Sequence, residues 1–96
     1  MRLDNSQIGQ ELKSLEGWSA EKGRLHKEFK FETFEDAIRF IDKVAIVASS
    51  INHHPEINNV YNKVTLNLDT HDEGGITELD FTLARLIDQI GTSPGN

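Results

Sequence analysis

Polar and apolar residues alternate from residue 63 to residue 70, and this alternation restricts the chain to folds with a one-sided β-sheet. A helix would scatter these apolar side chains around its axis, whereas a strand collects them on one face. Residues 57–61 form a second predicted strand that precedes the first, with Asn62 between them. We therefore predict two antiparallel strands joined by a tight turn. The predicted core-facing residues are Val64, Leu66 and Leu68, and those on the opposite face are Lys63, Thr65, Asn67, Asp69 and His71.

The same period of two marks a second hairpin over residues 18–32. Lys22 and Gly23 form its predicted turn, because glycine adopts the backbone conformations that tight turns require. His26 falls on the polar face of the second strand, where we expect an ordinary solvated surface histidine. The apolar residues of that strand are Leu25, Phe29 and Phe31.

Three segments with helical periodicity accompany the hairpins. Asn5 and Ser6 provide a cap for the first helix, and Gly17 ends it. Thr33 and Thr77 each stand three residues before an aspartate, an arrangement that resembles a capping box at the start of a helix. The three predicted helices cover residues 6–16, 34–51 and 77–90.

The order of elements is α-β-β-α-β-β-α, which predicts the fold class. We expect an α+β fold with a four-stranded antiparallel sheet and three helices on one face. A length of 96 residues fits a single domain over residues 1–96. Residues 91–96, with the sequence GTSPGN, are expected to form a flexible tail.

The helix predicted over residues 34–51 carries more apolar surface than one sheet covers. Its apolar side chains span an arc of about 180°, whereas a helix that rests on one sheet needs somewhat over ~100°. Phe40 and Val47 lie on a side of this helix that we expect to meet a partner subunit. Ile46 stands alone on the opposite, polar side. In the alternative, the terminal helices of the same chain cover the surplus face.

Composition excludes several classes of protein. The chain has no cysteine, which rules out disulfides, thiolate zinc sites and cysteine nucleophiles. Sixteen acidic and ten basic residues give a formal charge of -6, and the basic residues are scattered, so neither nucleic acid nor an anionic membrane is an expected partner. No apolar run approaches the ~20 residues that cross a bilayer, and no signal peptide is recognised. We expect a cytoplasmic protein.

Three of the four histidines lie within one segment of 27 residues, Ser49 to Gly75. His53 and His54 follow a predicted helix, and His71 follows a predicted strand, so both loops can meet at one edge of the sheet. A metal site is one interpretation, with Asp69, Asp72 and Glu73 as the source of oxygen ligands. Adjacent residues in extended chain point to opposite sides, however, so His53 and His54 do not readily share an ion, and no metal is predicted.

A second interpretation is that these histidines only make ordinary hydrogen bonds within their loops. Because three of them lie in two neighbouring loops, the pattern favours acid–base chemistry instead. Imidazole has an unperturbed pKa near ~6.5, so it serves as an acid or a base at neutral pH. No motif for an activated serine, a phosphate-binding loop or a dinucleotide accompanies the histidines. The pattern indicates proton transfer on a neutral organic substrate, without a covalent intermediate and without a cofactor.

The segment HHPEINNVYNKVTLNLDTH, followed by an aspartate, resembles the signature of the pterin-4a-carbinolamine dehydratases. That signature combines a histidine pair and a proline with a later aromatic residue, a third histidine and an aspartate. The resemblance extends over essentially the whole chain, because the order of helices and strands agrees as well. The matching residues are His53, His54, Pro55, Tyr61, His71 and Asp80.

The resemblance implies a reaction, a set of site residues and an assembly. The family dehydrates 4a-hydroxytetrahydropterin, the product of aromatic amino acid hydroxylases, to quinonoid dihydropterin during recycling of tetrahydrobiopterin, and it requires no cofactor. His53 and His71 are the implied proton-transfer groups, and His54 is implied to orient the substrate. Family members form dimers that pair into tetramers, so a homotetramer is expected, with a dimer as the fallback. The implied substrate-binding residues are Asn52, His53, His54, Asp69, Thr70, His71 and Asp72.

Three residues depart from the family pattern, and two other functions stay open. Ser49 and Asn52 stand where family members prefer charged residues, and Ile57 stands where a tryptophan is common. The first alternative is a protein-interaction module, because one animal member acts as a coactivator that binds the dimerisation region of a homeodomain transcription factor. The second alternative is a metal-binding domain built from histidine and aspartate. Retention of the three histidines favours the enzyme.

Overall fold

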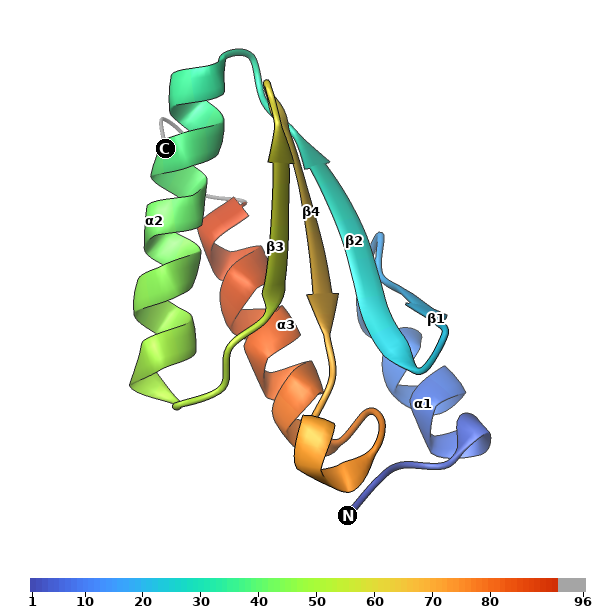
Figure 1. Cartoon of the computed structure of the whole chain (residues 1–96). Helices are drawn as coiled ribbons and strands as arrows, with labels where there is room; N and C mark the ends of the chain where they lie inside the picture. Colours follow the sequence, from blue (N-terminus) through green and yellow to red (C-terminus); the bar gives the residue numbers. More distant parts are fainter. Residues whose placement is uncertain (92–96) are drawn as a thin grey trace.

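The computed structural model describes residues 1–91 and has the predicted order of helices and strands (Figure 1). The expected flexible tail lies outside the described residues, apart from Gly91, the last residue of the final helix. The elements are α1 (Asn5–Leu12), β1 (Ser19–Glu21), β2 (Arg24–Lys30), α2 (Phe34–Ser50), β3 (Glu56–Val60), β4 (Lys63–Leu68), the 3₁₀ turn η1 (His71–Glu73) and α3 (Glu78–Gly91).

The four strands form one antiparallel sheet in the order β1-β2-β4-β3. Its register pairs Leu25 with Leu68 and Phe29 with Val64, so the apolar side chains of β2 and β4 share a face. Val64 and Leu68 are completely buried on this face, as is Leu66 between them. The strands predicted from the alternating pattern are therefore confirmed, and they make β4 the centre of the core.

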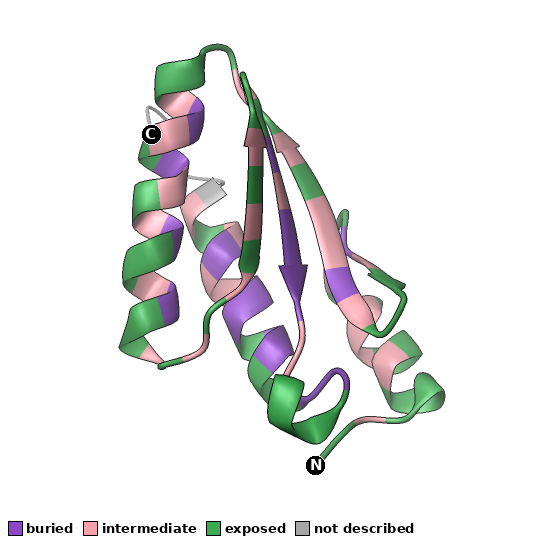
Figure 2. Ribbon diagram, in the orientation of Figure 1, coloured by how far each residue is buried: buried purple, intermediate pink, exposed green. Residues whose placement is uncertain are grey.

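The apolar face of the sheet and the helices enclose one core. Buried residues concentrate on β4 and on the sides of α2 and α3 that face the sheet (Figure 2). Leu3 and two apolar residues of α1, Ile8 and Leu12, pack against the same cluster from the amino-terminal side. Within residues 1–91, no helix has the length and apolar character needed to cross a membrane.

The two apolar sides of α2 have different fates, and one expectation about them is wrong. Phe40 and Val44 are buried in the core, because α2 packs against both α3 and β4. Val47, also expected to face a partner, packs against the same core, so cover within the chain is the correct alternative for this side. The side that remains open carries Phe34, which is 44% exposed, while Ile46 on the polar side is 70% exposed.

Helix α1 begins one residue earlier than predicted and is tied to α3. Its N-cap is Asp4, whose carboxylate accepts from the Gln7 backbone, and not Asn5 or Ser6. The Arg85 side chain of α3 donates to Glu11 at 2.6 Å and lowers the pKa of that carboxyl. A hydrogen bond with Glu11 raises the pKa of Glu78 at the start of α3. This contact holds α1, and the residues that precede it, beside the start of α3.

Candidate functional site

Two loops with histidines and the start of α3 meet at one end of the sheet. The loop after α2 carries His53 and His54, and η1 after β4 begins with His71. Figure 1 shows both loops at the lower end of the sheet, next to the first turn of α3. The expectation that the two loops meet is confirmed, and they do so where the strands end. This end of the sheet is the candidate site.

The end of α2 fixes the backbone position of His53. Asn52 adopts a left-handed conformation with φ 51°, which asparagine tolerates better than most residues. The His53 amide then donates back to the Ala48 carbonyl at 2.9 Å, and the Asn52 amide donates to Ser49 at 3.1 Å. These two bonds form a Schellman motif with asparagine at the left-handed position. The first histidine of the pair therefore leaves the helix in a defined direction.

The imidazole of His53 is bound to a buried carboxylate. His53 Nε2 lies 2.5 Å from Asp80 Oδ1, and the exposed fractions of the two side chains are 11% and 0%. Burial of a charged group is costly unless it is fully hydrogen-bonded, so the partners of Asp80 decide whether this arrangement is stable. The bond joins residues 27 positions apart in the chain.

Every other partner of Asp80 is also a donor. The Thr77 amide and the Thr70 hydroxyl each donate to Asp80 Oδ2 at 2.9 Å. Thr77 caps α3, and half of the predicted capping box is present. Asp80, the third helical residue, accepts from the Thr77 amide, whereas the Thr77 hydroxyl accepts from the amide of Leu79, the second helical residue. An ionised carboxylate only accepts hydrogen bonds, so the His53 nitrogen that faces it, Nε2, carries a proton. In the neutral form of the ring, Nδ1 then has a free lone pair. The site thus contains an imidazole whose orientation is fixed by a buried carboxylate.

The segment from Thr70 to Gly75 forms a closed loop that presents His71. Its ends pair with each other, because the Thr70 amide donates to the Gly75 carbonyl at 2.8 Å. Gly74 turns the chain with φ 73°, a conformation that favours glycine. His71 and Asp72 are exposed between these ends, and within residues 1–91 the His71 imidazole has no hydrogen-bond partner. One histidine of the site is therefore fixed by burial and another is open to solvent.

The remaining predicted residues take different positions. His54 is exposed, with its Nε2 3.5 Å from the Ser49 hydroxyl, and Pro55 leads into β3. Asp69 is half-buried between β4 and Thr70, close in sequence to the His71 loop. Tyr61 lies in the turn between β3 and β4, at the other end of β3 from the histidines. Asp80 therefore forms hydrogen bonds with both His53 and Thr70, whereas Tyr61 lies far from them along β3.

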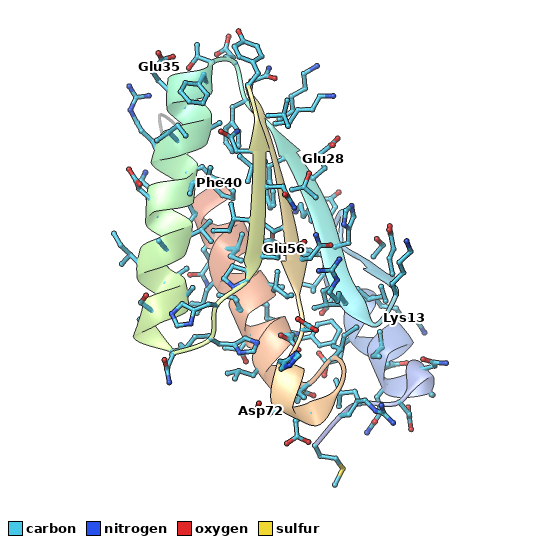
Figure 3. All side chains as sticks on the ribbon, viewed as in Figure 1. Lys13, Glu28, Glu35, Phe40, Glu56 and Asp72 are labelled. Carbon is cyan, nitrogen blue, oxygen red and sulfur yellow. The ribbon has the colours of Figure 1, made fainter. Side chains whose placement is uncertain are left out.

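His26 differs from its prediction. It lies on the predicted polar face of β2 but is only partly exposed, because β2 and β4 place it directly opposite Asn67, whose side-chain oxygen lies 2.8 Å from His26 Nδ1. Asn67 donates in turn to Glu56, at the start of β3 (Figure 3). This network lies on the face of the sheet opposite the apolar core residues, and within residues 1–91 no hydrogen bond connects it to His53. His26 is therefore separate from the candidate site.

Among the residues that the structure describes, no three side chains of the kinds that bind metal are grouped closely enough to hold an ion. A hollow of about 320 Å³ lies on the uncovered face of the sheet, beside Tyr61 and Val60, and no histidine lines it. The candidate site is therefore the end of the sheet with His53 and His71, because an imidazole bound to a carboxylate and an exposed imidazole occur there.

Sequence reasoning missed what connects these residues. Asp80 was recognised as a motif residue and as part of a helix cap, but not as the acceptor for His53 and Thr70. The available signal was an aspartate at the third position of a helix with an otherwise apolar inner face, where a carboxylate is buried and must find donors. Thr70 is predicted to bind substrate, and the sequence did not reveal that its hydroxyl also donates to Asp80.

Comparisons with known proteins agree with one another. The family model described as pterin 4 alpha carbinolamine dehydratase matches residues 1–90. A protein of Metallosphaera sedula, provisionally named a pterin-4-alpha-carbinolamine dehydratase, is 48% identical over 89 residues, which cover 93% of each chain. A crystal structure from Brucella melitensis, described as a transcriptional coactivator/pterin dehydratase, is 40% identical with a TM-score of 0.89, over 94% of this chain and 98% of that one.

A more distant solved structure has a different described role. It is a pterin dehydratase-like protein identified as a RuBisCO assembly factor in the alpha-carboxysome. Its identity to this chain is 25% and its TM-score is 0.65, over 79% of this chain and 88% of that chain.

We predict that Asp80→Asn destabilises the protein by about 1–3 kcal/mol. The NH2 group of asparagine would face a hydrogen-bond donor, where the carboxylate of Asp80 accepts a hydrogen bond. Urea denaturation measures the change. Asp69→Asn is the matched control: Asp69 has no hydrogen-bond partner within residues 1–91, so its substitution should stay within about 0.5 kcal/mol of the unsubstituted protein. Equal effects of the two substitutions would contradict the role assigned to Asp80.

Proposed function

This chain belongs to the pterin 4 alpha carbinolamine dehydratase family, and we propose that it dehydrates 4a-hydroxytetrahydropterin to quinonoid dihydropterin and water. The observation that carries the proposal is the hydrogen bond between His53 and buried Asp80 at an edge that also presents His71. This bond orients one imidazole with a buried carboxylate, an arrangement that suits acid–base chemistry.

The proposed reaction requires one acid and one base. The bond between C4a and the hydroxyl oxygen breaks, and an acid gives that oxygen the proton with which it leaves as water. A base takes the proton from N5, and the electron pair released there forms the new double bond between N5 and C4a. Neither step changes the oxidation state of the substrate, so histidine side chains suffice.

We assign the base role to His53. Its Nε2 proton is engaged by Asp80, which leaves Nδ1 as the acceptor, and the negative charge of Asp80 stabilises the imidazolium formed when Nδ1 takes the N5 proton. His71 is exposed and unpaired within the described residues, so it is the proposed acid for the departing hydroxyl. His54 is proposed to orient the substrate, together with the loop residues Asn52, Asp69 and Asp72 named above.

Fewer structural observations support the two non-catalytic alternatives than support the dehydratase. An interaction module would use the open side of α2 and would place no demand on His53 or Asp80. A metal-binding domain would need a cluster of ligands, and His53 Nε2 is already committed to Asp80. The same bond favours the dehydratase over both.

We predict that His53→Ala and His71→Ala each reduce the rate of dehydration by ~10²–10⁴-fold, because each removes an acid–base group. Stopped-flow turnover of freshly generated 4a-hydroxytetrahydropterin measures the rate. His26→Ala is the control, since it removes an imidazole from the separate network with Asn67 and should leave the rate unchanged. A double variant of His53 and His71 that is as fast as the unsubstituted protein would refute the mechanism.

We also propose that the chain forms a homotetramer through the open side of α2. Phe34 and Ala45 are exposed on this side and Ile38 is half-buried, so a stripe of apolar surface runs along the helix. Residues four and seven apart on a helix share a face, so a second copy of α2 can pack on this stripe. The corrected face replaces the one through Phe40, which the chain itself buries.

We predict a mass of four chains of 10.8 kDa in sedimentation equilibrium, and a smaller mass for Ala45→Glu. A glutamate at this exposed position costs a monomer little, but it would bury an unpaired charge between packed helices. Ile46→Glu is the matched control, because Ile46 is exposed on the polar side of the same helix. A monomer mass for the unsubstituted protein at micromolar concentration would rule out the assembly.

A further inference from the structure

The loop that carries His71 is held from two sides, and only one of them belongs to the hydrogen-bond network of Asp80. On the inner side, the Thr70 hydroxyl binds Asp80 and Thr77. On the outer side, the amino-terminal segment runs along the return of the loop: the Leu3 amide donates to the Ile76 carbonyl at 2.8 Å. Leu3 packs on the core, so the residue before it is directed across the loop.

Arg2 covers the backbone at Gly75. A methyl group added at position 75 would lie 2.6 Å from Arg2 Cδ and 3.0 Å from Arg2 Cγ, so the aliphatic part of the arginine occupies the space of a side chain. The guanidinium continues over the loop and reaches the Gly74 carbonyl at 3.5 Å. Gly75 is buried although the residues from His71 to Gly74 are exposed, which identifies Arg2 as part of its cover.

We propose that Arg2 and Gly75 form a positioning pair that holds the His71 loop in place from outside. Gly75 is the point of attachment, because its carbonyl accepts the Thr70 amide that closes the loop. Displacement of Gly75 therefore moves Thr70. Because His71 follows Thr70, this changes the distance between His71 and the Asp80–His53 pair. Arg2 acts through the backbone and touches no reacting atom.

The chemistry of the contact specifies which part of Arg2 is needed. The close approach involves Cγ and Cδ, which lysine also has, whereas the polar contact to Gly74 is long and exposed. Packing of the aliphatic stem is therefore the main interaction, in the way that arginine and lysine stems cover apolar surface while the charge stays in water. Arg2→Lys should preserve the pair and Arg2→Ala should break it.

The catalytic consequence rests on the proposed function, but the contact is testable without it. Hydrogen exchange of the Thr70 and Gly75 amides reports closure of the loop, and the Leu66 amide in the centre of the sheet reports global stability. Arg2→Ala should accelerate exchange at Thr70 and Gly75 by about tenfold and leave Leu66 unchanged. The same variant should reduce kcat of dehydration by about tenfold, because the acid is displaced from its partner.

A double-mutant cycle with matched controls decides the proposal. Gly75→Ala should resemble Arg2→Ala, and the double variant should be no worse than Arg2→Ala alone, since the collision is then absent. Arg2→Lys should leave amide exchange and kcat within about twofold of the unsubstituted protein. Gly9→Ala, where an added methyl group on α1 meets open space, should leave kcat unchanged. Additive effects of Arg2→Ala and Gly75→Ala, unchanged exchange at Thr70, or faster exchange without loss of kcat would each overturn the pair. If the unsubstituted protein lacks dehydratase activity, the function fails, and exchange alone decides the contact.

Discussion

The carboxylate of Asp80 is the constraint on which the candidate site depends. It is completely buried and accepts from His53, Thr70 and Thr77, which come from the loop after α2, the end of β4 and the start of α3. Removal of one partner would leave a buried charge short of hydrogen bonds, so this carboxylate stabilises the contact between the three segments. The carboxylate of Asp80 thus both orients the imidazole of His53 and connects the three segments at this end of the fold.

Ordinary rules for the ends of helices place the site around that carboxylate. The Schellman motif at the end of α2 uses Asn52 in a left-handed conformation and directs His53 outward from the helix. The capping box at the start of α3 requires an acceptor at its third residue, and Asp80 serves this cap with one oxygen and His53 with the other. Two structural motifs that many helices have therefore position the hydrogen bond between His53 and Asp80.

Local patterns made the fold predictable, while contacts between distant segments could not be predicted. The alternation along β4 and the turn at Gly23 determine the hairpins, because a strand's face and a turn's backbone depend on neighbouring residues. Which side of α2 meets the core depends on where α3 packs, so the side through Phe40 was assigned wrongly. The burial of His26 beside Asn67 is likewise set by strand register, which a single strand does not reveal.

The tautomer of His53 tests the central claim most directly. Long-range ¹H–¹⁵N NMR of the imidazole nitrogens at a pH where the ring is neutral distinguishes a proton on Nε2 from one on Nδ1. The account predicts a protonated Nε2 and an unprotonated Nδ1, because Asp80 is an acceptor and Nδ1 is the proposed base. A neutral ring protonated on Nδ1 would contradict it, since Asp80 would then have to donate the shared proton and Nδ1 could not take one from the substrate.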